Sequence, residues 1–187
     1  MMRFVDTKKN LGVLLAVSVL LAGCEASDTN VPEMRIQSPA FGQEEEIPLT
    51  YTFWGSKISP PLSFSVPPNE TKSLAVIMDD PDYSSGTRTH WLVWGLPPNA
   101  VLAENAQKDP PESLVFGTAD DIDETVGYLA PQPPAGDTHR YVFQVYALDK
   151  NITLKTGAHR NALDTAMEGH ILAKGELVGT VLGRKTP

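Results

Sequence analysis

Short runs of apolar residues with the spacing of β-strands recur along the chain. Residues 74–78 form a continuous apolar run with β-branched members, which is typical of a strand buried on both faces. Residues 62–66 alternate between apolar and polar side chains, as a half-buried strand does. Further strands are predicted over residues 90–96, 140–148 and 176–182.

One segment has the periodicity of a helix instead. Leu163, Met167 and Ile171 recur at four-residue steps, which predicts a helix over Ala158–Ala173 with one apolar stripe. Residues 103–138 are rich in Asp, Pro and Gly, and they predict long loops with at most short elements. Since strands outnumber helices, the pattern favours a mainly β fold, a sandwich with one short helix near the C-terminus. The 16 prolines and 14 glycines agree with many turns between short strands.

The N-terminal segment follows the pattern of a secretion signal. A basic head precedes an apolar run over residues 11–21, which leads into Leu21-Ala22-Gly23-Cys24. The run is shorter than the roughly 20 residues that a transmembrane helix needs. We therefore expect a lipoprotein signal peptide over residues 1–23 and a lipid anchor on Cys24, the only cysteine of the chain. An ordinary secreted protein, cut nearby and carrying a free thiol, is the alternative.

The rest of the chain is acidic and has the size of one domain. Residues 24–33 are polar and predict a tether, and residues 34–187 predict a single folded domain. The whole chain has a formal charge of −8, and removal of the leader would take away more basic than acidic residues. Such a charge argues against nucleic acid as a partner. The expected location is the bacterial cell envelope, with the domain facing the periplasm or the cell exterior.

Candidate chemistry begins where the buried strand over residues 74–78 ends. Asp80 lies in an Asp-Asp-Pro-Asp sequence, and Pro81 restricts the backbone there, so a carboxylate is presented at a rigid strand end. The same sequence is also common in ordinary turns. His90 opens the next strand, and strict alternation would place it on one face with Leu92 and Trp94. A histidine at a strand edge is often only a polar cap.

A second pair of polar side chains opens a later strand. His139 and Tyr141 are two residues apart, so they share a face, and Phe143 continues that face as an apolar residue. Two polar groups at the mouth of an apolar face are a common way to build a small-molecule pocket. Arg140 points to the other face, where pairing with a carboxylate is expected.

These motifs together resemble the phosphatidylethanolamine-binding protein family, in its bacterial branch related to Raf kinase inhibitor protein. The resemblance covers about residues 34–183. It rests on Ile58-Ser59-Pro60-Pro61-Leu62, Asp80-Pro81-Asp82, Thr89-His90-Trp91-Leu92-Val93-Trp94, Gly127-Tyr128, Pro133-Pro134 with Gly136, His139-Arg140-Tyr141 and residues 166–173.

The resemblance implies a sandwich of two antiparallel sheets with a small anion pocket at one end. It carries the pocket onto Asp80, His90, His139 and Tyr141, which we expect to converge in space. The implied ligand is a small anion of the phosphate or phosphoethanolamine type, with no metal and no cofactor. The pair Tyr83-Ser84 departs from the family's usual Ala-Pro, so the identity of the ligand does not transfer directly.

Three functions are compatible with these residues. The first is a membrane-anchored binding protein with an anion pocket and no catalytic residues. The second is an inhibitor of an envelope enzyme, such as a protease, acting through a protein–protein interface. The third is a periplasmic hydrolase that uses Asp80, His90 and His139, although their spacing matches no metal motif and the chain has no Gly-x-Ser-x-Gly sequence.

Overall fold

The computed structural model describes residues 31–119 and 124–185. The predicted signal peptide, Cys24 and most of the predicted tether lie outside the described residues. In chain order the elements are β1 (Ile36–Gln37), β2 (Glu45–Glu46), the 3-10 helix η1 (Leu49–Tyr51), β3 (Ser63–Phe64), β4 (Ser73–Asp80), β5 (Arg88–Leu96), β6 (Val115–Phe116), β7 (Thr138–Leu148), α1 (Arg160–Met167) and β8 (Ile171–Leu182).

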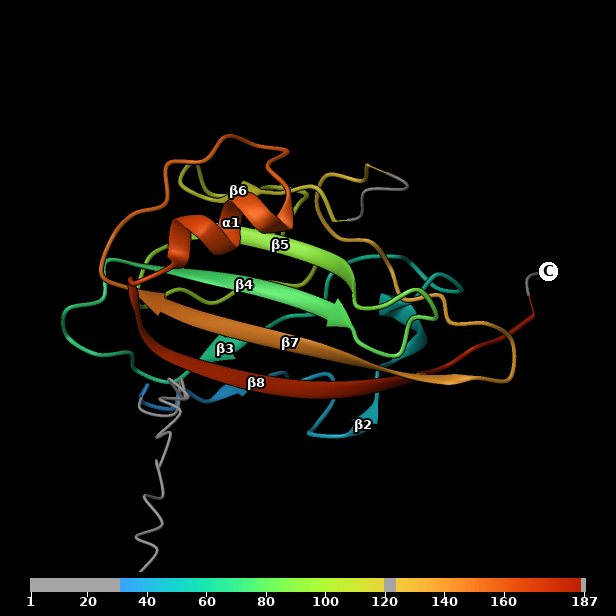
Figure 1. Ribbon diagram of the computed structural model, residues 1–187. Helices are drawn as coiled ribbons and strands as arrows, with labels where there is room; N and C mark the ends of the chain where they lie inside the picture. The colour runs from blue at the N-terminus through green and yellow to red at the C-terminus, as the bar shows by residue number, and fades with distance from the viewer. Residues whose placement is uncertain (1–30, 120–123, 186–187) are drawn as a thin grey trace, which may run out of the picture.

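Two sheets form the fold, and they differ greatly in size. The larger has six strands in the order β2-β8-β7-β4-β5-β6, and the smaller consists of β1 and β3 (Figure 1). All pairs in both sheets are antiparallel except β2 with β8, which is parallel. The predicted mainly β sandwich with one short helix is thus confirmed, and most of the strand structure lies in one sheet.

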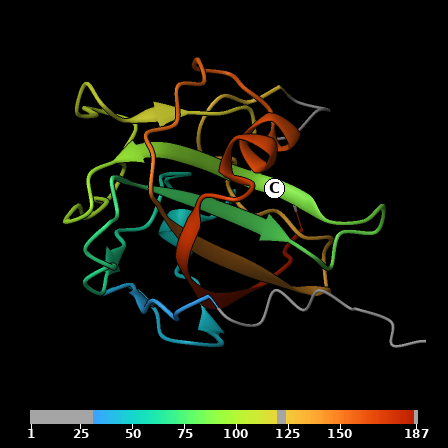
Figure 2. The same ribbon diagram turned by 60° about the vertical axis from the view of Figure 1, so that its left-hand side comes forward.

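Each face of the six-stranded sheet covers a separate hydrophobic core. On β4, Leu74, Val76 and Met78 point into the larger core, which also contains Phe143 from β7 and Ile36 from β1. The residues between them, Ala75 and Ile77, point into the smaller core with Leu163 and Met167 of α1. Figure 2 shows α1 on one side of the sheet and β1 with β3 on the other. Burial on both faces explains why the sequence of β4 is continuously apolar.

The predicted helix over residues 158–173 is too long. Helix α1 ends at Met167, and Ile171 already pairs with Leu148 as the first residue of β8. Gly169 separates the two elements, because its backbone is left-handed with φ of 73°. Ile171 lies four residues after Met167 and so continues the helical spacing. This is a coincidence, because Ile171 is the apolar first residue of strand β8.

Gly169→Ala is expected to destabilise the protein by about 1–2 kcal/mol, the cost of the left-handed conformation for a residue with a Cβ. No atom lies within 4 Å of the added Cβ, so the cost is conformational rather than steric. Urea unfolding of the variant measures it. The control is Glu168→Ala at the neighbouring exposed position, which we expect to stay within about 0.5 kcal/mol of the wild type. Equal stability of the two variants would contradict this interpretation.

Within the described residues, no helix combines the length and the apolar composition that crossing a bilayer would require.

Candidate ligand-binding site

Three strand ends meet at one end of the six-stranded sheet. Strand β4 lies between β5 and β7 and runs antiparallel to both, so its C-terminal end adjoins the N-terminal ends of its neighbours (Figure 1). Asp80 is the last residue of β4, while His90 and His139 lie near the starts of β5 and β7. The sheet topology therefore brings together residues that are up to 59 positions apart.

Asp80 and His139 form a direct, buried contact. The Asp80 Oδ2 and His139 Nδ1 atoms are 2.8 Å apart, and the two residues are only 2% and 6% exposed. The other carboxylate oxygen of Asp80 accepts a hydrogen bond from the backbone N–H of Asp82 at 2.9 Å. Since a carboxylate accepts hydrogen bonds, Nδ1 of His139 carries a proton. Any bond from this ring to a ligand would therefore use Nε2.

Tyr141 and His90 complete a contiguous group, which we call the Asp80 cluster (Asp80, His90, His139 and Tyr141). The rings of His90 and Tyr141 are nearly perpendicular, with centroids 5.1 Å apart. Burial is the main cause that raises the pKa of Tyr141, and the nearby Asp80 carboxylate raises it further. The phenol consequently keeps its proton at neutral pH. The structure thus brings the four side chains together, as expected from the sequence.

His90 lies on the other face of the sheet from the one that strict alternation along β5 predicts. Leu92 and Trp94 point into the smaller core beneath α1, whereas His90 contacts Tyr141 on the opposite face of the sheet. The prediction that these three residues share a face is wrong. The reason is a β-bulge: Asp79 pairs with Thr89 and Met78 pairs with Trp91, so His90 is an extra residue in β5.

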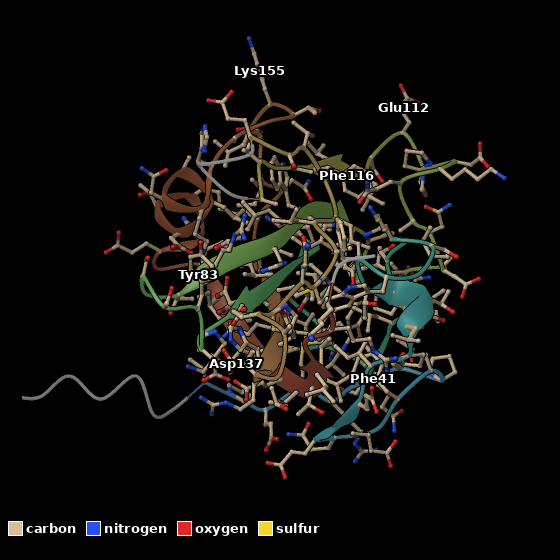
Figure 3. The ribbon with its side chains drawn as sticks, turned by 90° about the vertical axis from the view of Figure 1, so that its right-hand side faces the viewer. Phe41, Tyr83, Glu112, Phe116, Asp137 and Lys155 are labelled. Carbon is tan, nitrogen blue, oxygen red and sulfur yellow. The ribbon has the colours of Figure 1, made fainter. Side chains whose placement is uncertain are left out.

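The segment before β7 holds His90 in place. The His90 ring donates through Nδ1 to the carbonyl oxygen of Leu129 at 2.9 Å, and the N–H of Leu129 donates to the carbonyl oxygen of His90 at 2.8 Å. Further along, the N–H of Gly136 bonds the carbonyl oxygen of Gly183 at 3.0 Å. Figure 3 views the molecule from this end and labels Tyr83 and Asp137 on the loops that follow β4 and precede β7. Sequence reasoning did not identify Leu129, because its contribution comes from the backbone.

Asp79, the neighbour of Asp80, belongs to a different group of residues. Its carboxylate accepts from Arg160 Nη1 at 2.6 and 2.8 Å and from Thr89 Oγ1 at 2.9 Å. Arg160 is in α1 and also donates to Asp164 one turn later. These contacts attach α1 to the face of the sheet opposite the Asp80 cluster. Alternation along β4 predicts that Asp79 and Asp80 lie on opposite faces of the sheet. Nothing in the sequence indicates that the partner of Asp79 is Arg160, 81 residues away.

Arg140 pairs with Asp82, in agreement with the prediction that it meets a carboxylate. Its Nε and Nη2 atoms lie 3.0 and 2.6 Å from the two carboxylate oxygens, and its backbone N–H donates to Oδ2 at 2.8 Å. The hydrogen bond from Arg140 lowers the pKa of Asp82 from 3.8 to about 2. The pair connects the loop after β4 to β7 directly beside His139.

The lowered pKa of Asp82 predicts how stability changes in acid. The pair stabilises the folded state fully above the ordinary pKa of 3.8, and this contribution is lost as the pH falls towards 2. Between pH 4 and pH 2 the wild type should therefore lose more stability than Asp82→Asn, which has no carboxylate to protonate. Urea unfolding at several pH values measures both slopes, and identical slopes would contradict the assignment.

No three His, Cys, Asp or Glu side chains of residues 31–119 and 124–185 are arranged as a metal-binding group.

Comparison with known proteins places the chain in a family. Residues 37–182 match the family described as Phosphatidylethanolamine-binding protein. The chain belongs to this family. Among relatives, a UPF0098 protein of Pyrococcus horikoshii is 40% identical over 178 residues, which cover 92% of this chain and 88% of the relative. A UPF0098 protein of Chlamydia muridarum is 44% identical over 153 residues, or 79% of this chain and 97% of the relative.

Two crystal structures extend the family comparison to three dimensions. A putative phosphatidylethanolamine-binding protein homologue from Chlamydia trachomatis is 40% identical, with a TM-score of 0.71 over 79% of this chain and 96% of that protein. YbcL of Escherichia coli, described as a new member of the mammalian family, is 26% identical with a TM-score of 0.73. That likeness covers 80% of this chain and 98% of YbcL. The family predicted from the motifs is thus confirmed.

Proposed function

We propose that this protein is a membrane-anchored, extracytoplasmic binding protein that holds a small phosphate-type or other anionic ligand in the Asp80 cluster. The observation that supports the site is the 2.8 Å contact between Asp80 and His139, because it orients an imidazole within a buried polar group. Membership of a family described as phosphatidylethanolamine-binding agrees with a ligand of this chemistry.

The proposed binding chemistry depends on protonated imidazoles. The contact with Asp80 fixes the orientation of the His139 ring, and a charged ring would donate a stronger hydrogen bond from Nε2 to an anionic oxygen than a neutral ring does. Because Asp80 contributes one negative charge, the cluster becomes positive only when both His90 and His139 are protonated. The Tyr141 hydroxyl donates its one proton to the Asp80 carboxylate, and besides burial this hydrogen bond helps to raise the pKa of Tyr141.

The proposed location rests on the N-terminal sequence. The lipobox that ends in Cys24 would attach the domain to the membrane through an acyl group, and the polar residues that follow would act as a tether. The domain would then meet ligands of the envelope rather than those of the cytosol.

Calorimetric titration of the purified mature protein tests ligand binding. Sulfate, phosphate and phosphoethanolamine are titrated at pH 6 and pH 8, with sulfate included because it stays a dianion throughout. We expect all three to bind and sulfate to bind more tightly at pH 6, where imidazoles carry more charge. Absence of binding in the millimolar range would reject the proposal and favour the protein-inhibitor hypothesis. Release of inorganic phosphate from phosphoethanolamine would instead favour the hydrolase.

A further inference from the structure

A separate cleft opens between the two loop segments that follow β5. It has a volume of about 530 Å³ and is lined by residues 96, 97, 100–106, 108, 109, 111, 113 and 114. Its floor is formed by apolar side chains that are buried in the larger core, namely Leu96, Leu102, Ala106 and Leu114. This volume is within the range of small-molecule pockets, about 300–1,000 Å³, and such pockets are mostly apolar with few polar groups.

The cleft is distinct from the Asp80 cluster, none of whose four residues lines it. Glu112, next to the lining residue Pro111, is labelled in Figure 3 far from Tyr83 and Asp137, which mark the loops at the other site. A ligand in the cleft would therefore contact different side chains from those proposed to bind the anion.

One charged side chain of the cleft, that of Glu104, is held in position by a hydrogen bond from a neighbouring residue. The Tyr51 hydroxyl donates to Oε1 of Glu104 at 2.7 Å. Burial, followed by the nearby Glu104 carboxylate, raises the pKa of Tyr51 to about 12, so the phenol keeps the proton that it donates. The Tyr51 backbone is fixed in turn, because its carbonyl oxygen accepts from the buried Tyr128 hydroxyl at 2.8 Å. Glu104 thus presents a carboxylate in a defined place beside an apolar floor.

The charges around the cleft favour a cation over an anion. Its lining includes two carboxylates, Glu104 and Asp109, and one ammonium group, that of Lys108. Glu104 and Lys108 are both exposed, but Glu104 is oriented by the hydrogen bond from Tyr51, whereas Lys108 has a long flexible stem. An ammonium group has three N–H donors and no acceptor, which matches the oriented carboxylate.

We propose that this cleft binds a small, mainly apolar amine, with its ammonium group at Glu104 and its hydrocarbon against Leu96, Leu102 and Leu114. This site is additional to the anion site and uses none of its residues. The proposal is independent of the proposed anchor on Cys24.

Three probes with the same hydrocarbon and different head groups test the proposal: hexylammonium, hexanol and hexanoate. Each is titrated into isotopically labelled mature protein and followed by NMR chemical shifts. We expect hexylammonium to shift the signals of the cleft residues and to bind about threefold to fivefold more tightly than hexanol. Hexanoate should bind most weakly. The preference for the amine should shrink as salt is added, because the mouth of the cleft is exposed to solvent.

Two variants separate the charge from the cavity. Glu104→Gln keeps an acceptor for Tyr51 and removes the charge, so hexylammonium affinity should fall to that of hexanol. Ala103→Trp places a large ring at the mouth from an exposed position and should abolish binding of both probes. The matched control is Glu112→Gln, an exposed carboxylate that does not line the cleft, and it should change neither affinity.

The proposal is overturned if hexylammonium in the millimolar range leaves the signals of the cleft residues unchanged. It is also overturned if hexanoate binds as tightly as hexylammonium, or if Glu112→Gln has the same effect as Glu104→Gln. Titration of sulfate into the same samples reports on the Asp80 cluster, so failure of one site is distinguished from failure of the other. Unchanged circular dichroism of each variant confirms that the fold is kept.

Discussion

His139→Ala is expected to weaken the binding of phosphate-type anions by roughly tenfold to a hundredfold, which corresponds to the loss of about 1.5–3 kcal/mol for a hydrogen bond to a charged group. Two consequences of the substitution act in the same direction. It removes the Nε2 donor that we propose for the ligand. It also removes the bond from Nδ1 to Asp80, and it leaves a buried carboxylate that would repel an incoming anion.

Calorimetric titration of sulfate and phosphate at pH 6 measures the effect of His139→Ala. The control is Leu163→Met, a volume-conserving change on α1 in the smaller core, on the opposite side of the sheet from the Asp80 cluster. It should leave both affinities unchanged. Because His139 is buried, near-ultraviolet circular dichroism must show that the variant keeps its tertiary structure. Equal affinity of the folded variant and the wild type would remove His139 from the proposed site.

Cys24→Ser is expected to abolish lipid modification and membrane association altogether. The acyl anchor of a lipoprotein requires the cysteine sulfur, and a serine hydroxyl does not replace it as the attachment point. Each buried methylene of an acyl chain contributes about 0.8 kcal/mol to membrane binding, so loss of the chains removes nearly all of the attraction. The acidic protein has little electrostatic affinity for anionic lipid to compensate for this loss.

Expression in a bacterial host, detergent phase separation and intact-mass measurement test the anchor. Wild-type protein should enter the detergent phase and carry an acyl mass, and Cys24→Ser should accumulate as unprocessed precursor. Ala26→Ser serves as the control, since it changes a residue just past the lipobox and leaves the sulfur in place. If mature wild-type protein stays in the aqueous phase with no acyl mass, the secreted alternative with a free thiol is correct.

The positions of the main strands could be predicted from the sequence alone. Strands β4, β5 and β7 contain the ranges expected from apolar runs, because burial on a sheet face requires apolar side chains at regular positions. The helix predicted over residues 158–173 contains α1 but is longer than it. Local spacing does not distinguish the last apolar residue of a helix from the first of a strand, and the left-handed backbone of Gly169 separates them here.

The candidate site is predicted by motifs rather than by periodicity. Strand-end positions indicate Asp80, His90, His139 and Tyr141 individually, but only the motifs of the phosphatidylethanolamine-binding protein family predict that they form one pocket, since no period or spacing links residues so far apart. Alternation placed His139 and Tyr141 on one face, as the structure does, because β7 is regular there. Alternation places His90 on the wrong face, because β5 has a bulge at this residue. The bulge arises from the pairing of β5 with β4, and the order of apolar and polar residues in β5 does not reveal it.

The sequence by itself determined the fold class, the family and the residue types at the strand ends. These follow from local patterns of burial and from short motifs that can be read in order along the chain. Only the tertiary structure decided that Asp79 and Asp80 serve opposite faces, that Arg160 pairs with the first and His139 with the second, and that loops after β5 enclose an apolar cleft. Such contacts join residues distant in the chain, and they exist only once the strands are paired in a particular order and register.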